Sequence, residues 1–395
     1  MIADGRPIVE MIDMSLKLTG LTRERVESLW RNRKSSARSQ YDNESILAFA
    51  TGKPSEAFGE PYRVFDSERV IARLPGPPYK FLDRVTEVKG RPFDLKSGGE
   101  ALAHYDVPEG EWYFGSNRQP EMPFAVLLEV ALQPCGWLAA YCGSALSSEK
   151  DLSFRNLGGS AVQKIAITKD IGTLSTRVRM TSVSRSAGMI IQHYDFNVEN
   201  RGRSVYEGKT YFGFFSKEAL ADQVGLREAK LYSLSESERG RSEEFKLPRE
   251  APFPDDKFRM LDRVDLWVPD GGPQGLGVIE GGIKVDPAFW FFKAHFYQDP
   301  VWPGSLGLES FLQLMKVAAA KRWGAGPSAR FENVELGRKH VWSYRGQVLP
   351  ADRRVRVQCV ITAADDERRS LAADGFLTVD GRVIYEMKDF SLRLA

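Results

Sequence analysis

Two stretches of the chain, each of which starts with a proline, would be apolar nearly all round if they formed helices. They run through residues 123–133 and 303–313. A helix at a protein surface carries its apolar residues on one side, whereas a helix that is apolar all round is enclosed by other elements. Proline suits the first turn of a helix, where its missing N–H is not needed. The pattern predicts two buried helices, starting near Pro123 and Pro303.

The segments after the second apolar stretch alternate between apolar and polar residues, as half-buried strands do. The alternation covers residues 355–361, 376–379 and 383–385, and Asp380-Gly381 predicts a tight hairpin turn between the last two. Each half of the chain shows strand signals, one apolar helix and then further strands. We therefore expect an α+β fold in which an antiparallel sheet wraps around one helix per half.

The two halves are copies of one unit, because their matching residues keep a nearly constant separation. Seven matching pairs lie 178 to 180 positions apart: Leu82 and Leu261, Trp112 and Trp290, Asn117 and His295, Pro123 and Pro303, Glu129 and Glu309, Gln133 and Gln313, Gly202 and Gly381. The separation rises from 178 at Asn117 to 180 at Pro123, so the first copy lacks two residues there. A repeat that occurs twice indicates a tandem pair of domains.

Changes in composition divide the chain. Residues 1–45 mix charged and small residues and are expected to form a leader or linker, with one helical patch at Thr22–Trp30. The first copy is expected at 46–222 and the second at 251–395. Between them, residues 223–250 include a run of serine, glutamate and arginine that is typical of an inter-domain linker.

Composition excludes several classes of protein. The 395 residues are 42% hydrophobic and 27% charged, as in an ordinary globular protein. The 55 basic and 53 acidic residues nearly balance, so the protein has no strong positive electrostatic field. The composition therefore does not predict binding to nucleic acid or to a membrane surface. The three cysteines, Cys135, Cys142 and Cys359, lack metal-ligand spacing and indicate a reducing compartment. The start shows no signal segment, so we expect a cytoplasmic protein.

The most specific motif is His295-Phe-Tyr-Gln-Asp-Pro-Val-Trp-Pro-Gly304, followed by Glu309 and Gln313. Together with residues 345–350 and 380–385, it resembles the bacterial 3-hydroxydecanoyl-acyl-carrier-protein dehydratase, a hotdog-fold enzyme. The two-copy arrangement is similar to the tandem dehydratase region of polyunsaturated fatty acid synthases. The resemblance implies a double hotdog that belongs to a larger multienzyme or is its detached equivalent.

The resemblance also implies an activity and partners. The expected reaction is dehydration of (3R)-hydroxyacyl-acyl-carrier-protein to trans-2-enoyl-acyl-carrier-protein in fatty acid or polyketide synthesis, with or without isomerisation of the double bond. The acyl chain is then carried on the phosphopantetheine of an acyl carrier protein, and no metal or nucleotide cofactor is expected. The other domains of a synthase are expected partners, and a homodimer of the double hotdog is compatible with this assignment.

Dehydration needs a base for the C2 proton, an acid for the leaving hydroxyl and a donor for the thioester oxygen. His295 is the candidate base, since imidazole titrates near neutral pH. Gly304 is the candidate donor, because the first N–H groups of a helix are unpaired and lie at its positive end. A histidine among aromatic residues can instead be a core residue, and Pro-Gly can be only a turn. We expect the other histidines (His104, His193 and His340) to be structural.

Two carboxylates compete for the role of the acid. Glu129 and Glu309 each lie on an apolar helix with a glutamine four residues later, which can hold the carboxylate by a hydrogen bond. Burial should raise the pKa of either carboxyl group; the alternative is a salt-bridged glutamate at the helix surface. Proximity in sequence favours Glu309 as the partner of His295.

The resemblance favours the other pairing. In homodimeric hotdog dehydratases, the histidine of one unit works with the acid of its partner. His295 would then act with Glu129, held by Gln133. The reciprocal pocket would contain Asn117, Glu309 and Gln313, and it should be inactive because asparagine cannot take up the proton.

Two other functions are compatible with the sequence. A hotdog acyl thioesterase needs a carboxylate to activate water but does not need the histidine and Pro-Gly motif, and it would release free acid instead of an enoyl thioester. A non-catalytic acyl-binding module fits the first copy better than the second. Identification of the product distinguishes these hypotheses from dehydration.

Overall fold

The computed structural model describes residues 2–3, 6–7, 39–186 and 188–395. The chain divides into two compact units, Met1–Arg38 and Ser39–Ala395. In the first unit, strands β1 (Ile2–Ala3) and β2 (Arg6–Pro7) pair in antiparallel fashion. The helix expected at Thr22–Trp30 lies outside the described residues. The second unit holds both copies of the repeat.

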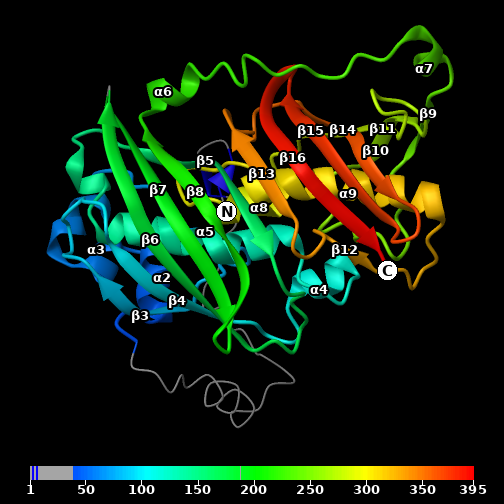
Figure 1. Cartoon of the computed structure of the whole chain (residues 1–395). Coiled ribbons are helices and arrows are strands. Elements are labelled where there is room, and N and C mark those ends of the chain that lie inside the picture. Colours follow the sequence, from blue (N-terminus) through cyan, green and yellow to red (C-terminus); the bar gives the residue numbers. More distant parts are fainter. Residues whose placement is uncertain (1, 4–5, 8–38, 187) are drawn as a thin grey trace. The chain divides into compact units, whose positions relative to one another are not determined.

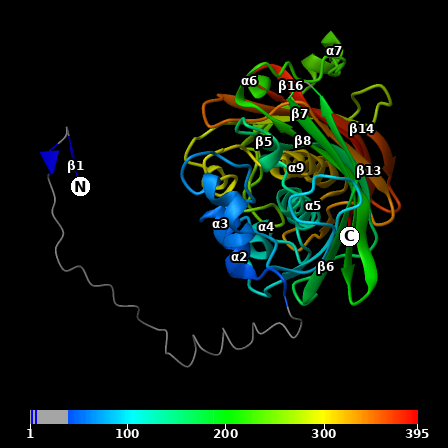
Figure 2. The same ribbon diagram turned by 90° about the vertical axis from the view of Figure 1, so that its left-hand side faces the viewer.

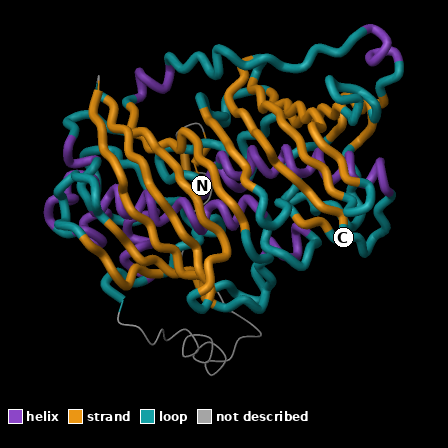
Figure 3. The backbone as a smooth tube through the Cα atoms, viewed as in Figure 1, coloured by secondary structure: helices purple, strands orange, loops and turns teal. Residues whose placement is uncertain are grey.

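The strands of both copies join in one sheet of 14 strands (Figures 1 and 3). All of its strand pairs are antiparallel. The first copy contributes β3 (Arg84–Lys89), β4 (Glu100–Asp106), β5 (Ser153–Gln163), β6 (Thr173–Ser186), β7 (Met189–Asn200) and β8 (Arg203–Phe215). The second copy and its linker contribute β9 (Glu243–Lys246), β10 (Arg263–Val268), β11 (Val278–Lys284), β12 (Phe331–Glu332), β13 (Lys339–Tyr344), β14 (Arg354–Asp365), β15 (Ser370–Val379) and β16 (Arg382–Leu394).

The strand order is the same in both directions from the middle of the sheet. From β5 outward it is β8, β7, β6, β4 and β3, and from β13 outward it is β16, β15, β14, β11 and β10. The copies meet where β5 pairs with β13, and Gly159 lies opposite Trp342 in that register. A Cβ atom on Gly159 would lie 2.5 Å from the Trp342 ring, so the junction depends on a residue without a side chain.

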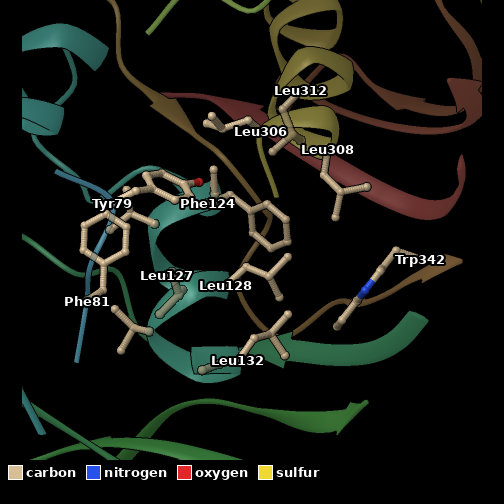
Figure 4. Close-up of a cluster of buried hydrophobic side chains, with 14 of the residues drawn as sticks. Tyr79, Phe81, Phe124, Leu127, Leu128, Leu132, Leu306, Leu308, Leu312 and Trp342 are labelled. Carbon is tan, nitrogen blue, oxygen red and sulfur yellow. The ribbon is translucent and has the colours of Figure 1, made fainter. Parts of the chain in front are cut away.

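The two apolar stretches form the long helices α5 (Phe124–Tyr141) and α9 (Gly304–Trp323). Pro123 and Pro303 cap them, one residue before each helix instead of within its first turn. In Figure 2 the sheet curves around both helices. Figure 4 shows apolar side chains of both helices together in one buried cluster, with Phe124, Leu128 and Leu308 among them. By length and composition α5 could cross a membrane, but 89% of it is buried inside the protein, as in a core helix.

Shorter elements cover the edges of this core. Helices α2 (Asn43–Ala50) and α3 (Pro54–Phe58) and the 3-10 turn η1 (Glu60–Phe65) pack beside α5. Tyr41 bridges to Val85, so packing begins a few residues before position 46. The expected linker at 223–250 follows α6 (Lys217–Ala221) and contains α7 (Glu236–Gly240). It also contains β9, which extends the sheet beyond β10.

The predicted α+β fold is confirmed. Each copy is an antiparallel sheet wrapped around one long helix, which is the hotdog arrangement, and the shared sheet makes the pair a double hotdog. The predicted hairpin turn is also confirmed, because Asp380 and Gly381 connect β15 to β16 with φ values of 47° and 86°. The strands are longer than the alternating stretches that predicted them.

Candidate active site

His295 ends the short helix α8 (Trp290–Ala294), just before the central helix of the second copy. Its side chain is 8% exposed, and its Nδ1 lies 3.0 Å from the carbonyl oxygen of Val301. A carbonyl oxygen only accepts hydrogen bonds, so Nδ1 carries the proton and Nε2 is free to accept one. Burial lowers the pKa of His295 to about 3, which keeps the imidazole neutral.

Glu129 lies on α5, in the first copy, and both of its carboxylate oxygens accept hydrogen bonds. Oε1 accepts one from the Ser305 hydroxyl at 2.6 Å, and Oε2 accepts one from Gln133 Nε2 at 3.0 Å. The Ser305 hydroxyl in turn lies 2.9 Å from the hydroxyl of Tyr79. Burial raises the pKa of Glu129 above its usual value, although the Ser305 and Gln133 hydrogen bonds act in the opposite direction.

Gln133 connects Glu129 to the chain that precedes the first strand. Its Nε2 also donates to the carbonyl oxygen of Tyr79 at 2.9 Å, and its Oε1 accepts from the Phe81 N–H at 2.7 Å. These bonds fix the amide, so one N–H must point at the carboxylate. The glutamine therefore holds Glu129, as its spacing on the helix predicted.

One pocket brings together predicted site residues from both copies. Gly304, the first residue of α9, shares it with His295, Glu129 and Gln133. The cavity in this pocket has a volume of about 100 Å³. Its walls are otherwise largely apolar or aromatic; they include Leu74, Pro75, Leu132, Gly136, Phe154, Phe212, Phe296, Val301, Trp302, Tyr344 and Tyr385.

A half-buried ion pair connects the loop that follows His295 to the other copy. Arg155 on β5 donates to both carboxylate oxygens of Asp299, each at 2.8 Å, and its Nε donates to Gln347 Oε1 at 2.7 Å. Burial alone would raise the pKa of Asp299, but the Arg155 charge holds it below its usual value. Paired hydrogen bonds between a guanidinium and a carboxylate fix orientation as well as distance. Arg155 thus braces the loop that follows His295.

The second predicted pocket has a different interior. Asn117, at the end of α4 (Trp112–Asn117), and Glu309 on α9 are both buried, and a lysine lies between them. Lys316 Nζ is 3.3 Å from Glu309 Oε1 and 3.4 Å from Asn117 Oδ1. Gln313 binds the preceding segment as Gln133 does, through the Phe258 carbonyl oxygen and the Met260 N–H. A buried cation therefore stands beside the second carboxylate.

The repeat shows how the two pockets diverged. With a separation of 180, Lys316 corresponds to Gly136, which is the one residue of α5 that is not buried and which lines the first pocket. By the same rule Ser305 corresponds to Ala125, and Gly304 to Phe124. Lys316, Ser305 and Tyr79 were not predicted from the sequence. The constant separation could have identified the first two, because each replaces a small apolar residue at a pocket position.

The remaining histidines lie away from this pocket. His104 contacts the hydroxyl groups of Thr86 and Ser175, and buried His340 contacts that of Tyr206. His193 stacks on a tyrosine ring at the outer surface of the sheet. Within the described ranges, no three His, Cys, Asp or Glu side chains lie close enough together to hold a metal ion.

The sequence of this chain is similar to that of a known protein. The chain is similar to a subunit of the polyunsaturated fatty acid synthase of Thraustochytrium sp. (strain ATCC 26185 / S-3), with 30% identity over 385 residues. The match covers 89% of this chain and 26% of that protein, so the chain spans about a quarter of the length of this relative.

Among solved structures, the chain is similar to a protein from Lactobacillus plantarum described as an oleoyl thioesterase, with a TM-score of 0.46 and 9% identity. That match covers 75% of this chain and 97% of the other. It is also similar to the dehydratase domain from the CurJ module of Curacin polyketide synthase, with a TM-score of 0.42, 13% identity, and coverage of 79% and 95%. The FabA-like domain matches residues 74–209 and 253–388, which together exceed half of the chain, and the chain therefore belongs to the FabA-like domain family as two tandem copies.

Proposed function

We propose that the chain dehydrates (3R)-hydroxyacyl thioesters to trans-2-enoyl thioesters, at the pocket that contains His295 and Glu129. The observation that carries the proposal is the convergence of three groups at one pocket: a neutral imidazole, a buried carboxyl group and a helix start with unpaired N–H groups. These are the base, the acid and the oxygen donor that the elimination requires.

His295 would remove the proton from C2 of the substrate. Its Nδ1 is engaged by Val301, so Nε2 is the atom that accepts the proton. The electrons of the C2–H bond form the new C2–C3 double bond as the C3–O bond breaks. Negative charge builds on the thioester oxygen during this step, and the N–H of Gly304 at the start of α9 would stabilise it.

Glu129 would give its proton to the departing hydroxyl group, which leaves as water. Burial favours the protonated carboxyl group, as this role requires. The pocket gains one positive charge on His295 and one negative charge on Glu129 in the same step, so its net charge does not change. The new carboxylate also favours the imidazolium, which offsets the low pKa of His295 in the empty pocket.

The natural substrate would be carried on the phosphopantetheine of an acyl carrier protein in a cytoplasmic synthase. The relative is a subunit of a synthase, and this chain matches only 26% of its length, which supports other parts of a synthase as partners. We propose no metal or nucleotide cofactor for the reaction, because the residues of the pocket supply the base, the acid and the donor.

The test is incubation of the protein with (3R)-hydroxyacyl thioesters of several chain lengths, followed by mass spectrometry and determination of double-bond position. The proposal predicts loss of water and an enoyl thioester with the double bond at C2; a bond at C3 would reveal isomerisation. Release of free acid would instead identify a thioesterase. Binding without any product would indicate an acyl-binding module.

A further inference from the structure

A tyrosine in the reaction pocket has a buried hydroxyl group with no partner. Tyr344 lies at the end of β13, lines the pocket and is 4% exposed. Its hydroxyl oxygen makes no hydrogen bond to any residue of the described chain. Buried hydroxyl groups nearly always form a hydrogen bond, because without one the free-energy cost of removing the group from water is not offset. An exception on a pocket wall points to a ligand atom as the missing partner.

The position of this hydroxyl relative to Gly304 suggests which ligand atom that is. A Cβ atom built on Gly304 would lie 3.0 Å from the Tyr344 ring and 3.2 Å from its hydroxyl oxygen. The hydroxyl group therefore lies directly beside the start of α9, where the first N–H groups have no acceptor within the helix. A side chain on Gly304 would occupy the space between these two donors.

The surroundings keep the tyrosine in place and protonated. Its ring packs against Tyr385 at a centroid distance of 4.4 Å, and the two residues face each other across β13 and β16. Burial, followed by the influence of Tyr385 and Glu129, raises the pKa of Tyr344 well above its usual value. The phenol therefore remains a hydrogen-bond donor at any pH at which the protein would work.

We propose that Tyr344 is a third catalytic residue, whose hydroxyl group donates a hydrogen bond to the thioester oxygen beside the N–H of Gly304. This inference rests on the proposed function and extends it from one oxygen donor to two. The second donor comes from a strand and not from the helix, so the oxygen would be held from two directions. The phenol does not transfer its proton, and the elimination remains balanced by His295 and Glu129.

The experiment compares Tyr344→Phe with Tyr206→Phe as a matched control. Tyr206 is another buried tyrosine of the same sheet, but its hydroxyl group is paired with His340 and does not line the pocket. Turnover is measured with (3R)-hydroxyacyl N-acetylcysteamine thioesters, and stability by denaturant unfolding. Binding of the saturated acyl thioesters, which lack the hydroxyl that is eliminated, is measured by calorimetry.

Tyr344→Phe is expected to lower kcat about 100-fold, as loss of one oxyanion donor does. It should weaken binding of the saturated thioester about tenfold and leave the unfolding midpoint unchanged or higher, because no protein hydrogen bond is lost. Tyr206→Phe should show the reverse: normal turnover and a lower unfolding midpoint. If both variants turn over as the wild type does, the inference is wrong.

Failure of the proposed function has a different signature. A wild-type protein that binds saturated thioesters without eliminating water from the hydroxyacyl substrates would contradict dehydration. The binding comparison would then still decide the role of Tyr344, since equal affinity in the wild type and Tyr344→Phe would exclude the hydrogen bond. Absence of both binding and turnover would overturn both proposals.

Discussion

Replacing Lys316 with methionine leaves a buried carboxyl group without its cation. The side chains of Lys316 and Glu309 are both 0% exposed, and their charged atoms lie 3.3 Å apart. Methionine has a similar length and can fill the same volume, so the main change is electrostatic. Asn117 also loses its contact with the ammonium group, which is 3.4 Å from its side-chain oxygen.

The expected cost follows from the chemistry of a buried ion pair. Breaking such a pair by removing one partner typically costs about 3–5 kcal/mol. Glu309 can limit this cost by binding a proton, since burial already raises its pKa. We therefore expect Lys316→Met to lower the free energy of unfolding by about 3 kcal/mol at neutral pH. Lys316→Met combined with Glu309→Gln removes both charges and should recover most of this loss.

The dependence on pH distinguishes this explanation from a simple packing defect. A carboxyl group whose folded-state pKa is raised stabilises the fold below its unfolded pKa, and this contribution is lost as the pH rises through the folded pKa. The deficit of Lys316→Met should therefore be smallest near pH 5 and should grow towards pH 8. Denaturant unfolding across this range measures it.

Lys321→Met on the same helix is the control, because its exposed ion pair with Glu243 should contribute less than about 1 kcal/mol. A deficit that is the same at every pH would refute the electrostatic reasoning. Loss of turnover in the folded variant to the level of His295→Ala would show that the second pocket is catalytic.

Three other changes test separate parts of the structure. Ser305→Ala removes a hydrogen bond that lowers the pKa of Glu129. The pKa of Glu129 should therefore rise, and the alkaline limb of the pH–rate profile should move to higher pH; an unchanged limb would contradict this. Gly159→Ala should destabilise the junction between the copies by about 1–3 kcal/mol in denaturant unfolding, whereas Gly110→Ala, with open space around it, should not. Burial lowers the pKa of His340 to about 3, so its contribution to stability is present above pH 6.5 and is lost as the pH falls. Between pH 6.5 and 5, this effect should lower the free energy of unfolding of the wild type by about 2 kcal/mol, and His340→Phe should lack that decrease. Equal acid sensitivity of the wild type and His340→Phe would count against this explanation.

Much of the fold could be predicted because the same sequence patterns for helices and strands occur in both copies of the repeat. The two stretches whose apolar residues fall on nearly all sides of a helix identified the buried helices, since an amphipathic surface helix has its apolar residues on one side. The single sheet that joins the copies was not predicted. Its junction depends on Gly159 lying opposite Trp342, and cross-strand pairing between distant segments leaves no periodic pattern in the sequence.

The site residues that could be predicted are those whose residue type and motif indicate a chemical role. His295, Glu129, Gln133 and Gly304 share one pocket in the structure, although the role of each stays a prediction. Hydrogen bonds formed by common residues were missed, because serine and tyrosine occur in many environments and only their partners reveal a function. Lys316 was missed for a related reason: a lysine on a helix is normally exposed, and nothing local shows that this one is buried.

The central claim is that His295 works with the carboxyl group of the other copy. The direct measurement is kcat for Glu129→Gln and Glu309→Gln side by side, with His295→Ala and Asn117→Ala as references. We predict that Glu129→Gln and His295→Ala each lose about 100- to 10,000-fold, while Glu309→Gln and Asn117→Ala retain most of their turnover once folded. Severe loss in Glu309→Gln with near-normal turnover in Glu129→Gln would contradict the account.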